Sequence, residues 1–98
     1  MNTPVSFETA KLLKEKGFDE QWNIYMHTPT LAEVVMWLYE EHGIHIEILL
    51  SEDHPWNSFY YRVMKVGNYF TLSHNGDYRK SPTEAYESAI EYCLKNII

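Results

Sequence analysis

The residues of this chain that could do chemistry are its five histidines, its single cysteine and a few neighbouring acidic residues. The set closest in sequence that could bind a metal ion comprises His42, His45, Asp53 and His54. An H-x-x-x-H spacing would hold two imidazoles on one helix face, but here a glycine separates a histidine that ends a helix from one in the next strand. The spacing therefore predicts no metal site, and nothing in the sequence predicts a cofactor.

Nucleophilic catalysis is not predicted either. Cys93 lies in the middle of the apolar stripe of a C-terminal helix, where a thiol without a neighbouring cation behaves as a small hydrophobic group. The acidic pairs, such as Glu40 and Glu41, fall on helix faces that we expect to be exposed. The sequence has no G-x-S-x-G, P-loop or G-x-G-x-x-G motif, so we expect no enzymatic activity.

Arg79 and Lys80 are weak candidates for phosphate contacts, because they stand just before the start of the last predicted helix. The sequence SPTEAYE follows them, with glutamates where a phosphate site needs cations. The alternative is that both cations balance local acids. A net charge of −6 also disfavours broad binding to nucleic acid or to anionic membranes.

Three helices with clear end signals must position these residues. Ser6 is the expected N-cap of a first helix that ends at Gly17, with Phe7, Ala10 and Leu13 on one face.

Thr30 and Glu33 predict a capping box for a central helix that ends at Gly43. The apolar face of that helix comprises Leu31, Val34, Val35, Leu38 and Tyr39. Ser81 and Glu84, with proline between them, predict a last helix that runs to about Asn96.

Alternating residues predict a three-stranded antiparallel sheet between the last two helices. The first strand covers 44–50 and the second 59–66, and a Gly67-Asn68 turn leads into the third, 69–73. That turn would place Val63 opposite Leu72. The predicted fold class is therefore α+β in one domain, residues 1–98, with the order α-α-β-β-β-α.

One face of this sheet is the best candidate for a partner-binding surface. It is the outer face, opposite the side that the two longer helices should cover, and it is unusually rich in apolar and aromatic residues. The alternative is that the first helix or residues 18–28 cover it. The predicted surface consists of Leu49, Tyr60, Arg62, Met64 and Tyr69.

The order of elements from Thr30 onward resembles the αβββα core of double-stranded-RNA-binding domains, with an extra N-terminal helix. Three sequence blocks, SFETAKLLKEKGFD, PTLAEVVMWLYEEHGI and SPTEAYESAIEYCLKNII, resemble a group of small uncharacterised proteins from Bacteroidetes and their phages or mobile elements. This resemblance covers most of the chain. It implies no activity, cofactor or catalytic residue.

The expected role is a small non-catalytic interaction or accessory module that binds a protein partner or forms a homodimer. The alternative is a nucleic-acid-binding module of the αβββα type. One cysteine allows no internal disulfide, and the sequence has neither a signal peptide nor an apolar run of about 18 residues, so we expect a cytoplasmic protein without membrane contact.

Overall fold

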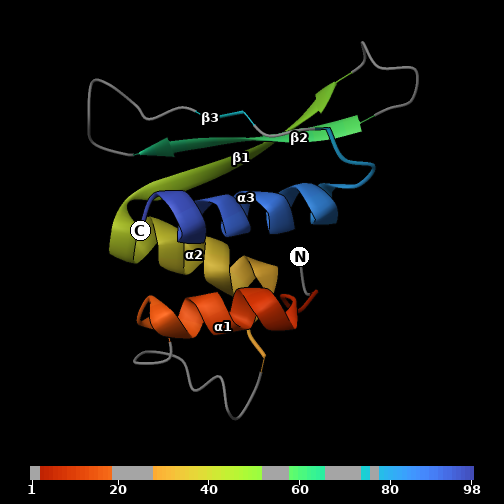
Figure 1. The fold of residues 1–98 in the computed structure, drawn as a ribbon. Helices are drawn as coiled ribbons and strands as arrows, with labels where there is room; N and C mark the ends of the chain where they lie inside the picture. The colour runs from red at the N-terminus through yellow and green to blue at the C-terminus, as the bar shows by residue number, and fades with distance from the viewer. Residues whose placement is uncertain (1–2, 19–27, 52–57, 66–73, 76–77) are drawn as a thin grey trace.

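Three helices and an antiparallel sheet make up the part of the chain that the structure, a computed structural model, describes: residues 3–18, 28–51, 58–65, 74–75 and 78–98. In chain order the elements are α1 (Phe7–Glu15), α2 (Leu31–His42), β1 (Ile44–Ser51), β2 (Ser58–Lys65), β3 (His74–Asn75) and α3 (Pro82–Asn96) (Figure 1). The α+β class is confirmed. Among the described helices, none has the length and apolar character that crossing a membrane requires.

The helices begin and end at the predicted signals. The Thr30 hydroxyl accepts a hydrogen bond from the Glu33 N–H (3.3 Å), and the Glu33 carboxylate accepts one from the Thr30 N–H (3.0 Å). Gly43 ends α2 in the left-handed region, at φ 65°, which a residue without Cβ adopts at little cost. In α3 the N-cap bond from the Glu84 N–H to Ser81 is present, but the Glu84 carboxylate accepts from the Lys80 N–H, one residue earlier than predicted.

The predicted apolar face of α1 is partly wrong. Leu13 is fully buried, but Phe7 is 78% exposed and rests near the Lys11 ammonium, 5.7 Å from the ring centroid. Thr9 is buried instead, because its hydroxyl donates to a carboxylate oxygen of Glu87 on α3, at 2.9 Å. A hydrogen bond to a distant helix therefore sets which side of α1 faces inward.

The central helix α2 supplies much of the core, as predicted, but it is not covered all round. Its buried residues are Leu31, Val34, Trp37 and Leu38. Met36 and Tyr39 are exposed, so the expectation that Tyr39 joins the buried face is wrong. The Trp37 indole packs edge-on against Phe18, with ring centroids 5.2 Å apart, and Phe18 is itself fully buried.

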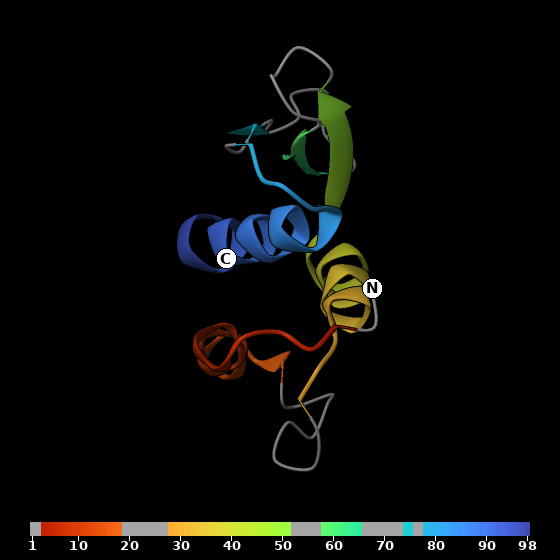
Figure 2. The same ribbon diagram turned by 90° about the vertical axis from the view of Figure 1, so that its right-hand side faces the viewer.

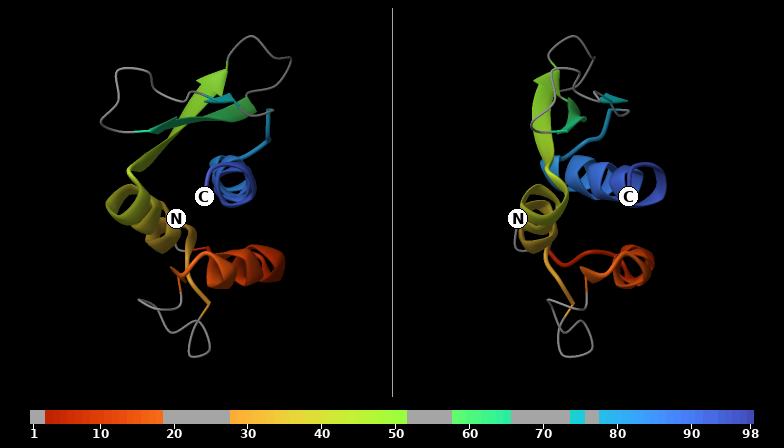
Figure 3. Two further views of the ribbon diagram at one scale, coloured as in Figure 1. Left: turned by 60° about the vertical axis from the view of Figure 1, so that its left-hand side comes forward. Right: turned by 90° about the vertical axis from the view of Figure 1, so that its left-hand side faces the viewer.

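All three helices lie on one side of the sheet (Figures 1 and 3). Helix α3 is next to the strands and contacts β1, β2, α1 and α2, whereas α1 lies on the side of α3 away from the sheet. The residues before α1 are tied to the start of α2, since the Leu31 N–H donates to the Thr3 carbonyl (2.9 Å) and the Val5 N–H to the Pro29 carbonyl (3.0 Å). The core therefore forms where α3 meets α2 and the inner face of the sheet.

The predicted three-stranded sheet is wrong. Only β1 and β2 form an extended antiparallel pair among the described residues. They pair over eight consecutive positions, from Ile44↔Lys65 to Ser51↔Ser58. The described β3 has only two residues and pairs Val63 with His74, two residues beyond the predicted partner Leu72. Because β3 has only two residues in the described part of the chain, the likeness to the αβββα core of double-stranded-RNA-binding domains is lost. The Gly67-Asn68 turn and residues 69–73 lie outside the described residues.

The inner face of the β1–β2 ribbon carries apolar residues that alternate along each strand. Ile44, Ile46, Tyr61 and Val63 are each at most 5% exposed. The two strands cross at an angle in Figure 3, as the twist of an isolated pair of strands leads one to expect. This twisted ribbon is what presents the opposite, outer face.

Candidate functional site

The outer sheet face consists of three cross-strand pairs of β1 and β2. In order from the start of β1, these are His45↔Met64, Glu47↔Arg62 and Leu49↔Tyr60. His45 is exposed and the other five are half-buried. The structure therefore brings together four of the five predicted surface residues, Leu49, Tyr60, Arg62 and Met64. The fifth, Tyr69, lies outside the described residues.

The first helix does not cover this face. Helix α1 packs on α3, on the far side from the sheet, as two views at right angles show (Figures 1 and 2). Residues 18–28 were the other segment expected to cover this face. Phe18, the first of them, faces the core beside Trp37. Residues 19–27, the remainder of that segment, with Trp22, lie outside the described residues. Among the described elements, no helix lies across the outer sheet face.

Two tyrosines from other elements border the outer sheet face. Tyr78, which follows β3, meets Tyr60 edge-on with ring centroids 5.6 Å apart and is 48% exposed. Tyr39 of α2 meets His45 at 6.5 Å. Neither was among the predicted surface residues. Tyr39 was assigned to the buried face of its helix, and the pairing of Arg79 with Phe59, which brings Tyr78 to β2, is a long-range contact without a local sequence signal.

The outer sheet face does not extend to the far end of the ribbon. Ser51 and Ser58 are on the same side by alternation, yet both are buried. Leu50, which alternation assigns to the inner face, is 50% exposed. The exposed apolar surface of β1 therefore changes sides between Leu49 and Leu50.

The chemical character of the outer sheet face suits contact with another protein. An Arg and a Glu face each other across the strands at its centre, and a methionine and a leucine–tyrosine pair flank them. Tyrosine, methionine and arginine are enriched at protein interfaces because they combine large contact area with polar groups that fix orientation.

Arg79 and Lys80, the candidate phosphate contacts, both make hydrogen bonds within the fold. The Arg79 backbone exchanges two 2.7 Å hydrogen bonds with Phe59, and its guanidinium donates to the Ser88 hydroxyl (3.1 Å) and the Tyr78 carbonyl (3.2 Å). The Lys80 N–H donates to the Glu84 carboxylate, so an acid already occupies the position where a phosphate would bind. Arg79 thus joins β2 to α3.

Two of the histidines, His42 and His45, pack against aromatic rings. His42 meets Trp37 with ring centroids 4.7 Å apart, and His45 meets Tyr39. His54 and Asp53 lie outside the described residues. In the part of the chain that the structure describes, no three His, Cys, Asp or Glu residues are grouped so as to hold a metal ion.

Cys93 is fully buried in α3, as predicted. Burial raises the pKa of its thiol from 9.0 to about 12, because the surrounding apolar atoms disfavour the thiolate. A thiol in this state is a poor nucleophile at neutral pH.

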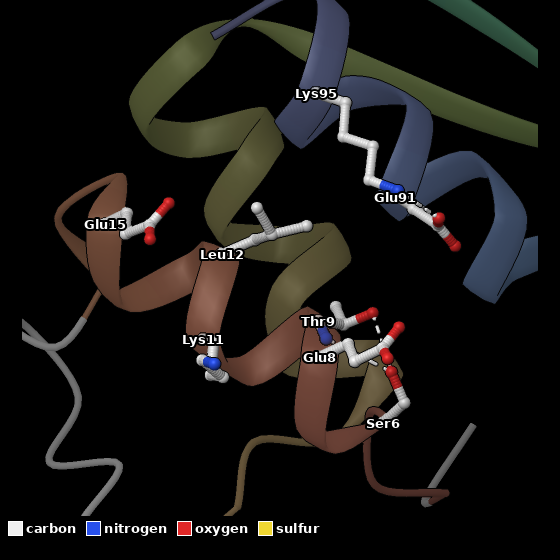
Figure 4. Close-up of a pocket in the computed structure, with 8 residues that line it drawn as sticks. All are labelled: Ser6, Glu8, Thr9, Lys11, Leu12, Glu15, Glu91 and Lys95. Carbon is white, nitrogen blue, oxygen red and sulfur yellow. Dashed lines mark hydrogen bonds and ion pairs between the residues drawn. The ribbon is translucent and has the colours of Figure 1, made fainter.

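A polar groove of about 380 Å³ lies between α1 and α3 (Figure 4). Lys95 donates to Glu91 at 2.6 Å on one wall, and this hydrogen bond raises the pKa of Lys95. Ser6 and Thr9 lie on the other wall, and the Thr9 hydroxyl bonds Glu87. The bond from Thr9 to Glu87 joins the two helices, whereas the bond from Lys95 to Glu91 lies within α3. The groove is lined by Ser6, Glu8, Thr9, Lys11, Leu12, Glu15, Glu91 and Lys95.

No protein-family model, curated protein or solved structure matches this chain.

Proposed function

We propose that this protein is a non-catalytic protein-interaction module that binds its partner through the outer sheet face. The observation that carries the proposal is the placement of Leu49, Tyr60 and Met64 on a sheet face away from all three helices. Apolar and aromatic residues grouped on a surface mark contact sites more often than chance allows.

Other features support a binding role over an enzymatic one. The thiol is buried, and His42 and His45 pack against aromatic rings. The single cysteine favours a reducing, cytoplasmic compartment. The resemblance of three sequence blocks to small Bacteroidetes and phage proteins favours an accessory role in a mobile element.

The test compares partner capture by the wild-type chain and by a Tyr60→Glu, Met64→Glu double variant. Two carboxylates on the outer sheet face should abolish specific capture, because an apolar contact would have to desolvate them. Phe7→Glu is the matched control: Phe7 is more exposed than either residue and lies on α1, away from the sheet. Circular dichroism must show that the double variant and the Phe7→Glu control both fold.

Capture that the double variant retains in full would contradict the proposal. So would unfolding of the double variant, since the face would then belong to the core. Binding to DNA or RNA that weakens steeply between low and moderate salt would instead support a nucleic-acid role.

A further inference from the structure

Strand β1 forms one edge of the sheet. The strand order is β1-β2-β3, so β2 pairs with one long side of β1 and no described strand pairs with the other. Figure 2 shows β1 at the margin of the fold. An unpaired edge of eight residues can bind another strand through its main chain.

Hydrogen bonds elsewhere in the sheet show which groups of β1 point outward. Phe59 exchanges both main-chain bonds with Arg79, so its N–H and C=O point away from β1. The direction alternates along a strand, so Tyr60 points toward β1 and bonds its partner Leu49. By the same alternation, the free edge carries the N–H and C=O groups of Ile44, Ile46, Ile48 and Leu50.

The β1 edge lacks three of the features that prevent edge pairing in other proteins, namely proline, lysine and a β-bulge. Its sequence, IHIEILLS, contains no proline and no lysine. Its register with β2 is continuous over eight pairs, so no bulge twists the edge away. Proline, lysine and β-bulges are features by which other proteins keep a strand edge unpaired.

The inner face of β1 becomes progressively more exposed along the strand. Ile44 is 1% and Ile46 5% exposed, Ile48 is half-buried, and Leu50 is 50% exposed. A second strand beside the edge could cover the open end of this apolar row.

A second copy of β1 supplies such a strand when it runs antiparallel. In an antiparallel pair, residues directly opposite each other have their side chains on the same face of the sheet. The twofold axis that relates the two copies therefore passes through a residue of β1 and not between two residues. An axis at Glu47 would set two glutamates side by side, which is unfavourable. An axis at Ile48 pairs Ile48 with its copy and Leu50 with the partner copy's Ile46, so a buried position of each chain meets the exposed leucine of the other.

We propose that two copies of this chain associate through antiparallel pairing of their β1 edges, with Ile48 on the twofold axis. The two sheets then form one continuous sheet. This interface is the edge of β1 and not the outer sheet face, so the dimer and the partner-binding proposal stand or fall separately.

Sedimentation velocity of the full chain over a range of concentrations tests the dimer. The wild-type mass should rise from 11.7 kDa toward twice that value. Leu50→Lys should raise the dissociation constant at least about tenfold, because its ammonium would be buried opposite Ile46. Leu50 is half exposed in the monomer, so the variant should keep its circular dichroism spectrum. Phe7→Lys, an equally drastic change on α1, should dimerise as the wild type does.

Cysteine crosslinking tests the register. Ile48→Cys should form an intermolecular disulfide under mild oxidation, because paired Cα atoms lie roughly 5.5 Å apart, within disulfide range. Glu47→Cys should not, since its copies would be diagonal neighbours about 7–8 Å apart. The wild type, whose only thiol is buried, is the blank.

A wild-type chain that stays monomeric at every concentration would overturn the proposal, as would undiminished dimerisation of Leu50→Lys. A disulfide in Glu47→Cys but not in Ile48→Cys would overturn the register. The outer-face double variant should dimerise normally, so loss of partner capture and loss of dimerisation can be told apart.

Discussion

At the residue scale, Cys93 shows how burial sets the chemistry of a side chain. The thiol has no exposed surface, and its pKa is raised from 9.0 to about 12 by desolvation. The native state thus holds the proton more tightly than the unfolded chain does. The raised pKa of the thiol therefore contributes to the free energy of unfolding. This contribution is fully present below about pH 9 and is lost as the pH rises toward 12.

We expect native Cys93 to resist iodoacetamide at pH 8 and to react once the chain is unfolded in denaturant. The thiolate fraction is negligible in the native state, and the sulfur is shielded. Mass spectrometry of alkylated protein measures the reaction. Met36→Cys is the positive control, because Met36 is 53% exposed on α2 and a thiol there should label at once. Rapid native labelling at Cys93 would show that α3 opens readily or that the thiol is activated.

At the scale of the element, α2 has one face in the core and one in solvent. Leu38 is fully buried, whereas Met36, two residues earlier, is exposed. The helix therefore offers a matched pair of substitutions.

Leu38→Ala should lower the free energy of unfolding by about 2–5 kcal/mol, through lost burial and a residual cavity. Met36→Ala should change it by less than about 0.5 kcal/mol, as for other exposed positions. Urea melts of both variants measure the difference. Equal effects would mean that the two faces of α2 are assigned wrongly.

The helices were predictable because their signals are local. The Thr30–Glu33 box and the glycine at position 43 act within one turn, and both appear in the structure. The side of α1 that faces inward was not predictable, since Thr9 is buried by Glu87, which lies 78 residues away. Local periodicity favoured Phe7 for that role, and Phe7 is exposed.

The sheet was only partly predictable for a similar reason. Alternation correctly placed Ile46 and Val63 on the inner face and Tyr60 on the outer sheet face. The third strand depended on a turn-based register, and the observed partner of Val63 is His74 instead of Leu72. A shift of two residues keeps each side chain on its face, so the pattern alone cannot distinguish the two registers.

At the scale of the whole molecule, the layers differ in what holds them together. Helix α3 is joined to the sheet by apolar burial, including Ala89 and Ile90. Helix α1 has Leu13 in the core but also depends on polar links to α3, in which Thr9 and the Ser6 N–H both donate to Glu87. The Lys16 ammonium adds a 2.6 Å bond to the Ile98 carbonyl. We infer that α1 is the layer most easily detached.

Thr9→Val should lower the free energy of unfolding by about 1–2 kcal/mol, because it removes a buried donor and leaves the Glu87 carboxylate undersatisfied. Thr83→Val, at an exposed position of α3, should have almost no effect. Hydrogen exchange should show α1 amides losing protection in Thr9→Val while α3 amides remain protected. Equal loss in both helices would show that they open as one unit.

The direct connection from α2 to β1 limits how the length of this chain can vary. Gly43 alone separates His42 from Ile44, so the end of the helix sets the first inward residue of the strand. Inserting or deleting one residue there would turn Ile44 and Ile46 to the outside and bring His45 and Glu47 into the core. Selection should therefore remove insertions and deletions of single residues between Leu31 and Ser51. Related sequences should keep the length of this stretch even where they differ by substitutions.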